Sequence, residues 1–405
     1  MSFDIALSGI SAASTDLNTI SNNIANADTT GFKQSRAEFG DFFQNAAYNL
    51  QSTTTGTGVG VETIAQQFSQ GSVTNTSNPL DMAISGQGFF TLKENGALVY
   101  TRNGAFTTDS NGYVVSATGQ RLQVFPPVAG TSTFSTGTLT DLQISAAPNP
   151  PLATSTIGAG INLPANASAP ATATFSPTDS TSYNQTTSVT TYDSLGAAHT
   201  TGLYFVAGAA PGSWTVHTVV DGAEQGTGTA LTFGTAGTLT APANGQVPLT
   251  FTPANGAAVM NMTIDLGAAT EYGSTFSVNS LTQNGYTTGQ LSGVSIGANG
   301  VVTANYTNGQ TAALGQVAMA NFANPQGLQQ LGNATWSQTL ASGTALAGAA
   351  GTSDIGVVQS GALESSNVDL TQQLVQMLSA QRNYQANSQV ISTEDQNLQA
   401  ILHLQ

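Results

Sequence analysis

The two ends of the chain carry hydrophobic residues at helical spacing. From residue 3 to residue 24, a repeat of four and three positions falls mostly on apolar side chains, which is typical of an amphipathic helix. The same repeat runs from residue 370 to residue 405. We predict a helix at each end and expect its apolar stripe to be buried by packing. The stripe positions are Phe3, Leu7, Ile10, Leu17, Ile24, Leu370, Leu374, Met377, Tyr384, Ile391, Leu398 and Leu402.

Capping residues set the expected helix boundaries. The first helix should end no later than Gly31, since glycine readily adopts the left-handed conformation that closes many helices. The second should begin near Asn367, a residue type that favours the N-cap, with Asp369 in the first turn, where the helix dipole favours negative charge. At 1.5 Å per residue, that helix would be roughly 55 to 60 Å long.

Between the ends, the pattern changes to alternation with turn signals. Asn-Gly pairs begin at residues 95, 103, 111, 299 and 308 and lie between short strand-like runs, and further such runs include residues 89–92 and 201–206. Asn-Gly is the strongest short-range signal for a β-hairpin. No helical stripe of useful length interrupts residues 85–320. The middle of the chain is therefore predicted to be mainly antiparallel β structure.

Proline marks a boundary inside this β region. Residues 147–151 read Ala-Pro-Asn-Pro-Pro, which cannot continue a central strand. A second turn signal, Asn284-Gly285, precedes a fresh series of strands from Val294 to Phe322, so we expect the chain to re-enter the first β domain at about residue 285. We expect an α+β multidomain fold with two β domains outward of the helices. The helical ends, 1–30 and 364–405, would form a coiled-coil-like inner domain, and 31–70 a connector. Residues 71–146 and 285–363 would form one β domain, and 147–284 an inserted outer one.

The other faces of both predicted helices are neutral rather than charged. They carry Asn, Gln, Ser and Thr where a soluble coiled coil would carry charges beside its seam. Two helices that pack only against each other would explain the apolar stripes but not the missing charges. We expect the ends to pack against each other and against neighbouring copies, and to stay loosely ordered until assembly supplies those copies.

Composition narrows the function classes. The chain has 405 residues, 6 basic and 21 acidic, for a net charge of −15, and only 7% of its residues are charged. Scattered basic residues argue against nucleic acid, which requires a clustered basic surface. The absence of cysteine excludes disulfides and thiolate sites. The N-terminus lacks the basic region of a cleaved secretory signal, and no apolar run is long enough to predict a membrane span.

Three sets of residues are of types found in metal or phosphate sites but lack the remaining residues that such sites need. The histidines His199, His217 and His403 are isolated and lack a second ligand at zinc-site spacing. Residues 56–60 are glycine-rich but lack the lysine of a phosphate loop, and residues 109–112 resemble the start of a calcium loop without its later glutamate. We expect no catalytic, cofactor or metal site. The alternative is a carbohydrate-active β enzyme with two carboxylates in a cleft, although such an enzyme does not need the terminal helices.

Three blocks of sequence resemble the flagellar rod and hook protein family. Residues 22–33 read NNIANADTTGFK and resemble the family's N-terminal signature, residues 85–90 and 100–106 resemble its next block, and residues 361–370 and 381–387 its C-terminal block. The blocks occur in the family's order. The signature positions are Asn23, Asn26, Thr30, Gly31, Phe32, Gly88, Phe89, Asn367, Val368, Asp369, Gln381, Arg382 and Tyr384.

The resemblance implies a structural role without catalysis. Rod subunits of the family share the ends but are much shorter, so the length is similar to that of a hook subunit, which polymerises into a flexible tube that transmits motor torque to the filament in flagellum-dependent motility. A distal rod subunit remains the alternative. The resemblance implies self-association, contact with the rod and with hook–filament junction proteins, and contact with the hook cap and the flagellar type III export apparatus during assembly. The protein would be extracellular in the hook of the basal body, without direct membrane insertion.

Overall fold

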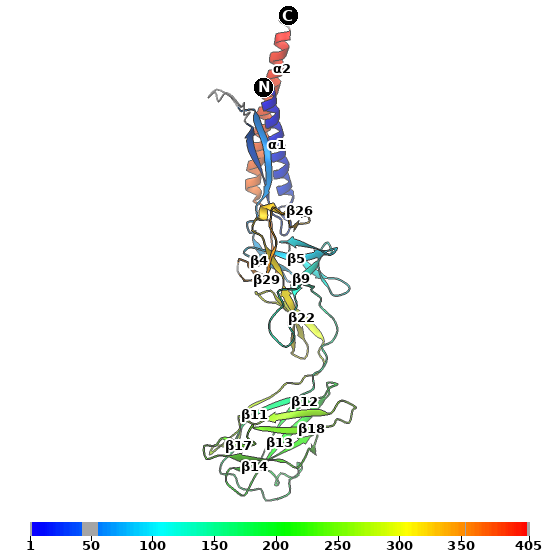
Figure 1. Cartoon of the computed structure of the whole chain (residues 1–405), viewed down its shortest axis with the longest axis vertical. Helices are drawn as coiled ribbons and strands as arrows, with labels where there is room; N and C mark the ends of the chain where they lie inside the picture. The colour runs from blue at the N-terminus through cyan, green and yellow to red at the C-terminus, as the bar shows by residue number, and fades with distance from the viewer. Residues whose placement is uncertain (1, 43–55, 353, 403–405) are drawn as a thin grey trace. The chain divides into compact units, whose positions relative to one another are not determined.

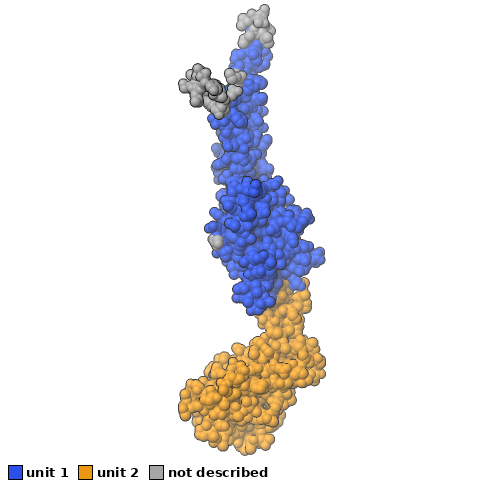
Figure 2. Space-filling view, viewed as in Figure 1, with its two compact units in different colours: residues 1–145, 293–305, 311–405 blue, residues 146–292, 306–310 orange. Residues whose placement is uncertain are grey.

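The computed structural model describes residues 2–42, 56–352 and 354–402. The chain folds into two compact units, shown in Figure 2. Unit 1 contains residues 1–145, 293–305 and 311–405, and unit 2 contains residues 146–292 and 306–310. Both predicted terminal helices belong to unit 1. The predicted combination of terminal helices with mostly β structure is confirmed.

Unit 1 pairs its two helices and adds a β-hairpin beside them. Helix α1 (Ser2–Ala25) packs against α2 (Leu370–Leu402), as Figure 1 shows. Strands β1 (Ser35–Phe42) and β2 (Gly58–Gln66) form an antiparallel hairpin that contacts α1, where Ser8 Oγ lies 3.2 Å from the backbone nitrogen of Val59. The hairpin lies within residues 31–70, where the sequence pattern predicted no strand.

The remainder of unit 1 is a largely antiparallel sheet with two small strand pairs. Its main path runs β22-β23-β24-β9-β5-β6-β27-β26, while β4 pairs with β29 and β3 with β30. The strands are β3 (Val73–Asn75), β4 (Met82–Ser85), β5 (Phe89–Glu94), β6 (Ala97–Thr101), β7 (Phe106–Thr108), β8 (Val114–Ser116), β9 (Arg121–Phe125), β10 (Thr140–Asp141), β22 (Leu291–Ile296), β23 (Val301–Tyr306), β24 (Thr311–Val317), β25 (Met319–Asn321), β26 (Gln329–Gly332), β27 (Thr335–Ser337), β28 (Leu346–Gly348), β29 (Val357–Ser360) and β30 (Ala362–Glu364), with the short helix η1 (Pro325–Gly327) before β26.

An aromatic cluster anchors the hairpin to this sheet. The ring of Phe89 lies 5.5 to 5.8 Å from the rings of Phe68, Trp336 and Phe322 in edge-on contacts. Gln66, the last residue of β2, accepts a hydrogen bond from Trp336 Nε1 at 2.6 Å. The hairpin and the sheet are therefore joined by packing and by a directed polar contact.

The Asn-Gly signals account for several hairpin turns. Asn95 and Gly96 join β5 to β6 with φ values of 48° and 89°, the paired positive angles of a type I′ turn. Gly300 and Gly309, with φ of 77° and 78°, lie in the turns on either side of β23. These positions favour glycine because other side chains are strained at positive φ.

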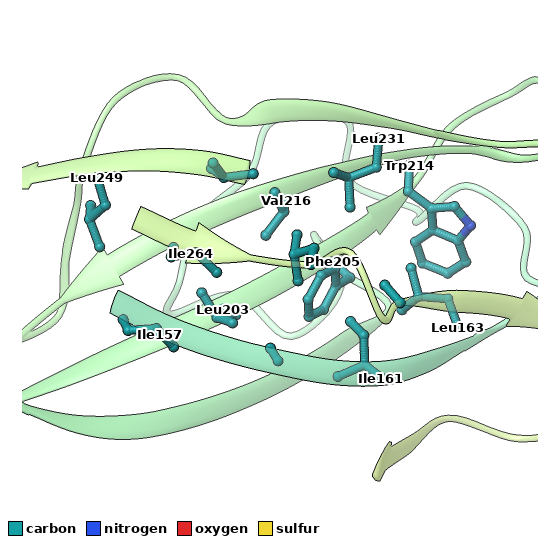
Figure 3. Packing of buried hydrophobic residues seen from close by; sticks show 14 of the residues in the cluster. Ile157, Ile161, Leu163, Leu203, Phe205, Trp214, Val216, Leu231, Leu249 and Ile264 are labelled. Carbon is teal, nitrogen blue, oxygen red and sulfur yellow. The ribbon is translucent and has the colours of Figure 1, made fainter. Parts of the chain in front are cut away.

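Unit 2 is built from two sheets that share one core. The first has the order β18-β19-β11-β20 with β21 on β11, and the second has the order β12-β13-β14-β16-β17 with β15 on β14. Buried residues from both sheets meet between them, including Ile161, Phe205 and Trp214 (Figure 3). The strands are β11 (Thr156–Pro164), β12 (Gln185–Tyr192), β13 (Ala198–Ala207), β14 (Ser213–Val220), β15 (Ala223–Glu224), β16 (Thr229–Phe233), β17 (Leu239–Ala241), β18 (Gln246–Phe251), β19 (Met260–Asp265), β20 (Thr270–Tyr272) and β21 (Ser277–Gln283).

His199 in unit 2 lies between two carboxylates. Its Nδ1 is 2.6 Å from Asp221 Oδ2, and its Nε2 is 3.4 Å from Asp193 Oδ2. Burial lowers the pKa of His199, but the hydrogen bonds to both carboxylates outweigh it and raise the pKa above its usual 6.5. Burial likewise opposes the ionised form of Asp221, yet its hydrogen bonds from His199 and the Thr200 N–H hold the pKa below 3.8.

These shifts predict how the stability of unit 2 depends on pH. The raised pKa of His199 contributes stability that is present below 6.5 and is lost as pH rises through the folded-state pKa. The contribution of Asp221 is present above 3.8 and is lost as pH falls through its lowered pKa. Amide exchange in β13 and β14, corrected for intrinsic pH effects, should therefore accelerate from mildly acidic toward alkaline pH.

Two histidine variants test this assignment. His199→Gln should remove the alkaline acceleration, whereas His217→Gln should retain it, because His217 contacts a different carboxylate, Glu224 Oε1, at 2.6 Å. Identical pH profiles for the unmodified chain and His199→Gln would contradict the assignment.

Candidate functional site, the terminal helices and their junction

Apart from Ile20, the fully buried residues of α1 and α2 have small or polar side chains. A Cβ added at Gly9 would lie 2.7 Å from Asn387 Oδ1, so glycine permits close approach of the helices there. Ile20 is the one large apolar side chain among the fully buried residues of the described helix pair. The buried residues are Ala6, Ala12, Ala13, Thr19, Ile20 and Asn23 on α1, and Gln373 and Ala380 on α2.

Large apolar side chains of both helices are exposed instead. Phe3 is 48% exposed, Leu374 is 53% exposed and Leu398 is 57% exposed. A dense set of exposed apolar residues marks an interaction surface, because burying half of a leucine side chain contributes roughly 1 kcal/mol. The same exposure class includes Ile5, Leu7, Leu370, Val375, Leu378, Tyr384 and Val390.

The predicted apolar stripe differs from the face that the helices bury against each other. Among its described members, Phe3, Leu7, Leu370, Leu374, Tyr384 and Leu398 are exposed, and Ile10, Leu17, Ile24, Met377 and Ile391 are half-buried. The side chain of Leu402 lies outside the described part of the chain. None of the described members is fully buried, so their role in packing between copies stays a prediction.

Asn23 connects the end of α1 to α2 and to the hairpin. Its side chain is 1% exposed. Its Nδ2 donates to the Ser35 carbonyl at 2.7 Å and to Gln373 Oε1 at 3.1 Å, and its Oδ1 accepts from the Ser35 N–H at 2.8 Å. An aliphatic side chain here would leave buried backbone groups unsatisfied.

The turn after α1 is formed by the next signature residues. Asn26 Nδ2 donates to the Asn22 carbonyl at 2.9 Å, and Thr30 follows half-buried. Gly31 has a φ of 69°, donates its N–H to the Glu364 carbonyl at 2.8 Å, and lies so close to Asn103 that an added Cβ would be 2.5 Å from that residue's nitrogen. Phe32 is then buried.

A buried charge cluster joins the N-terminal, middle and C-terminal signature blocks. Lys33 Nζ lies 2.6 Å from Glu364 Oε1, with both side chains fully buried, and Arg102 Nη1 lies 3.3 Å from Glu364 Oε2. The Gly71 N–H also donates to Glu364 Oε1 at 2.9 Å. Burial lowers the pKa of Lys33 and of Arg102, and Glu364 opposes both effects. One carboxylate is thus the shared counter-charge of two buried cations.

Arg102 also contacts the middle signature block. Its Nη2 donates to the Gly86 carbonyl at 2.9 Å, and its guanidinium carbon lies 5.5 Å from the centre of the Phe89 ring. Gly88, which precedes β5, has a φ of 115°, a conformation that side chains rarely adopt. This block therefore positions the guanidinium against the buried carboxylate.

Asp369, rather than Asn367, caps α2, so the predicted N-cap was wrong. Asp369 Oδ1 accepts from the N–H groups of Thr371 and Gln372 at 2.8 and 3.1 Å. The Asn367 side chain instead accepts from the Gln34 N–H at 2.8 Å and donates to the Gln67 carbonyl at 2.7 Å. Asn367 thus holds both ends of the hairpin beside the start of α2.

The remaining signature residues are more open to solvent. Val368 is half-buried, whereas Gln381, Arg382 and Tyr384 are exposed on α2. Lys33, Arg102 and Glu364 lie in the three sequence blocks, but nothing in their local sequence patterns connects them. Because only 7% of the residues are charged, a charged residue in each of the three blocks is the sequence feature that could have indicated a shared site.

Residues 109–113, which resemble the start of a calcium loop, form a turn. Asp109 Oδ1 accepts from the N–H groups of Asn111 and Tyr113 at 2.8 Å each, which makes residues 109–113 a self-satisfied turn. Across the described residues, no group of three His, Asp or Glu side chains is placed to hold a metal ion. In the same part of the chain, no helix is long and apolar enough to cross a membrane.

Four sequence-family descriptions match consecutive parts of the chain. Residues 3–33 match the flagella basal body rod protein family, and residues 83–174 match the flagellar hook protein FlgE/F/G D1 domain. Residues 162–286 match the flagellar basal body protein FlaE D2 domain, and residues 359–404 match the C-terminal region of flagellar basal body rod FlgEFG proteins.

Whole proteins match over nearly their full lengths. The chain is 39% identical to flagellar hook protein FlgE of Escherichia coli (strain K12), covering 100% of both chains, and 34% identical to that of Rhizobium meliloti (strain 1021), covering 98% and 97%. It is similar in structure to Helicobacter pylori flagellar hook protein FlgE2, with a TM-score of 0.53 over 71% of this chain and 99% of that one. At 14% identity, this likeness supports the fold alone.

Proposed function

The chain belongs to the flagellar hook protein family, and from this premise we propose that it is the structural subunit of a bacterial flagellar hook. Copies polymerise into a flexible helical tube that acts as a universal joint and transmits motor torque to the filament. A head-to-tail contact between different surfaces that does not close generates a filament of indefinite length.

The unburied apolar surface of the terminal helices carries this proposal. The fully buried residues of the two helices are mostly small or polar, while Phe3, Leu374 and Leu398 remain about half exposed. Neighbouring copies would bury these side chains in the assembled tube. The neutral faces of both helices suit such contacts, because Asn and Gln can hydrogen-bond without the desolvation cost of a charge.

We assign the parts of the chain to layers of the tube on this basis. Residues 1–30 and 364–405 form the inner layer around a channel, and residues 31–70 connect it to a β domain made of residues 71–146 and 285–363. Residues 147–284 form an outer β domain. The buried contacts of Lys33 and Arg102 with Glu364 support a firm connection between the inner layer and the β domain.

The same premise extends to partners and location. The tube joins the rod at its proximal end and hook–filament junction proteins at its distal end, and the hook cap and the type III export apparatus act during its assembly. Subunits are exported through that apparatus and become part of the extracellular hook. The protein has no enzymatic role and binds neither nucleic acid nor membrane.

Polymerisation of the purified full-length chain tests the proposed function. Raising protein concentration under polymerising salt conditions should give tubes that bend, visible by electron microscopy. Straight tubes would favour the distal rod alternative. If the protein stays monomeric at every protein and salt concentration tested, the result would contradict the subunit role and favour the carbohydrate-active enzyme.

A further inference from the structure

Asp16 on α1 is a partly buried carboxylate without a counter-charge in its own chain. It is half-buried and makes no hydrogen bond or ion pair with any residue that the structure describes. Burial raises its pKa because desolvation disfavours the ionised form and no cation offsets it. A hydrogen-bond donor from another molecule would stabilise the ionised Asp16 carboxylate.

A small cavity beside Asp16 is lined mostly by polar side chains, which could receive such a donor. Its volume is about 130 Å³. Arg36 also lines it, but that guanidinium pairs with Glu38 Oε1 at 2.7 Å and is 65% exposed. The amide oxygens of Asn23, Gln373 and Gln376 already accept hydrogen bonds within the chain, so the Asp16 carboxylate is the main acceptor that the cavity offers to a planar donor with several N–H groups. The amide side chains that line the cavity are Asn23, Gln34, Gln67, Gln372, Gln373 and Gln376.

Arg382 is the one basic residue of the described helix pair, and it has no partner there. It is exposed on α2 and forms no hydrogen bond or ion pair with any described residue. It follows the buried Ala380 by two positions, about 200° around the helix, so it lies on the side of α2 that faces away from α1. It therefore cannot reach Asp16 of its own chain.

Asp16 and Arg382 nevertheless lie at nearly the same height on the helix pair. Gly9 is opposite Asn387, and Asn23 is opposite Gln373, so the helices run antiparallel and Asp16 is level with Ala380. Arg382 is two residues farther along, or roughly 3 Å. A second copy beside the first with little axial shift would bring its Arg382 to this cavity.

We infer that Arg382 of one copy inserts into the cavity beside Asp16 of a laterally adjacent copy. This inference rests on the proposed polymeric function and names one contact within it. Charge complementarity selects a second copy as the occupant, since the cavity presents an unpaired carboxylate and the chain presents one unpaired guanidinium at matching height. Because the two residues lie on different faces, the contact is heterologous, as an open polymer requires.

Charge reversal at either residue should impair assembly. Arg382→Glu and Asp16→Arg should each raise the protein concentration needed for tube formation roughly tenfold or more, since each places like charges together in a partly desolvated contact. Lys93→Glu is the matched control for Arg382→Glu, because it makes the same charge change at an exposed position on β5. It should shift that concentration less than about twofold.

Mixing the two impaired variants tests whether the contact lies between copies. An equimolar mixture of Arg382→Glu and Asp16→Arg can restore opposite charges at each contact when copies alternate, so it should form tubes near the unmodified concentration. The double variant Asp16→Arg with Arg382→Glu should also recover. Asp16→Arg combined with Lys93→Glu has the same net charge and should not.

Each contrary outcome has a defined meaning. If both single variants assemble at the unmodified concentration, or if the double variant recovers while the mixture does not, the inferred contact is overturned. If Arg36→Glu is impaired as much as Arg382→Glu and is rescued by Asp16→Arg, the cavity belongs to Arg36 and the inference is wrong. If the unmodified chain forms no tubes at all, the proposed function itself fails.

Discussion

Replacing Leu374 with aspartate is expected to abolish tube formation while leaving the monomer folded. In one chain Leu374 is 53% exposed, so the introduced carboxylate remains solvated, and the unfolding free energy should fall by only about 1 to 2 kcal/mol from the lost apolar burial and the lower helix propensity of aspartate. In a tube, the same position would lie against a neighbouring helix. Burying an unpaired carboxylate there costs several kcal/mol, which raises the concentration needed for assembly by roughly a hundredfold or more.

Sedimentation and electron microscopy measure this effect, and circular dichroism checks the monomer. Leu374→Met is the matched control, since it keeps the volume and apolar character of the side chain and should retain assembly. Tubes formed by Leu374→Asp at the unmodified concentration would exclude this residue from the contact. Unfolding of the β structure in the Leu374→Asp monomer would show that the sheet does not fold independently of the helix contacts.

Removing the buried carboxylate of Glu364 is expected to destabilise unit 1 strongly. Glu364→Gln leaves Lys33 and Arg102 buried beside each other with no counter-charge. Losing one partner of a buried pair typically costs about 3 to 5 kcal/mol. We expect unit 1 to unfold at a much lower denaturant concentration, with unit 2 largely unaffected because its core is separate.

Amide exchange in β5 and β30, compared with that in β13 of unit 2, resolves this effect by unit. Glu38→Gln is the matched control, because its pair with Arg36 is exposed on both sides and should contribute about 0 to 1 kcal/mol. Equal losses for Glu364→Gln and Glu38→Gln would mean that the buried cluster does not stabilise the junction.

The terminal helices were predictable because their apolar spacing is regular, but the face they bury was not. The large residues of the stripe, such as Leu370 and Leu374, are exposed, while Ala380 and Gln373 contact the other helix. Periodicity identifies an amphipathic helix without identifying what covers it. Here the small residues allow close approach within the chain, and the large ones remain for other molecules.

A single sequence could not predict the long-range contacts or the irregular hairpin. Lys33 and Glu364 are 331 residues apart, and neither residue's local pattern indicates the other. The β1–β2 hairpin was missed because its alternation is weak, with glycines at positions 40, 58 and 60. Both Asn367 and Asp369 are residue types that favour caps, and the choice between them depended on Gln34 and Gln67, which only the fold brings close.

Amide hydrogen exchange on the isolated chain and on assembled tubes tests the central claim most directly. In dilute, demonstrably monomeric protein, α1 and α2 should exchange rapidly while β5, β13 and β14 remain protected. In tubes, both helices should become strongly protected, because neighbouring copies then cover Phe3, Leu374 and Leu398. Strong protection of both helices in the dilute monomer would contradict the claim that other copies complete their burial.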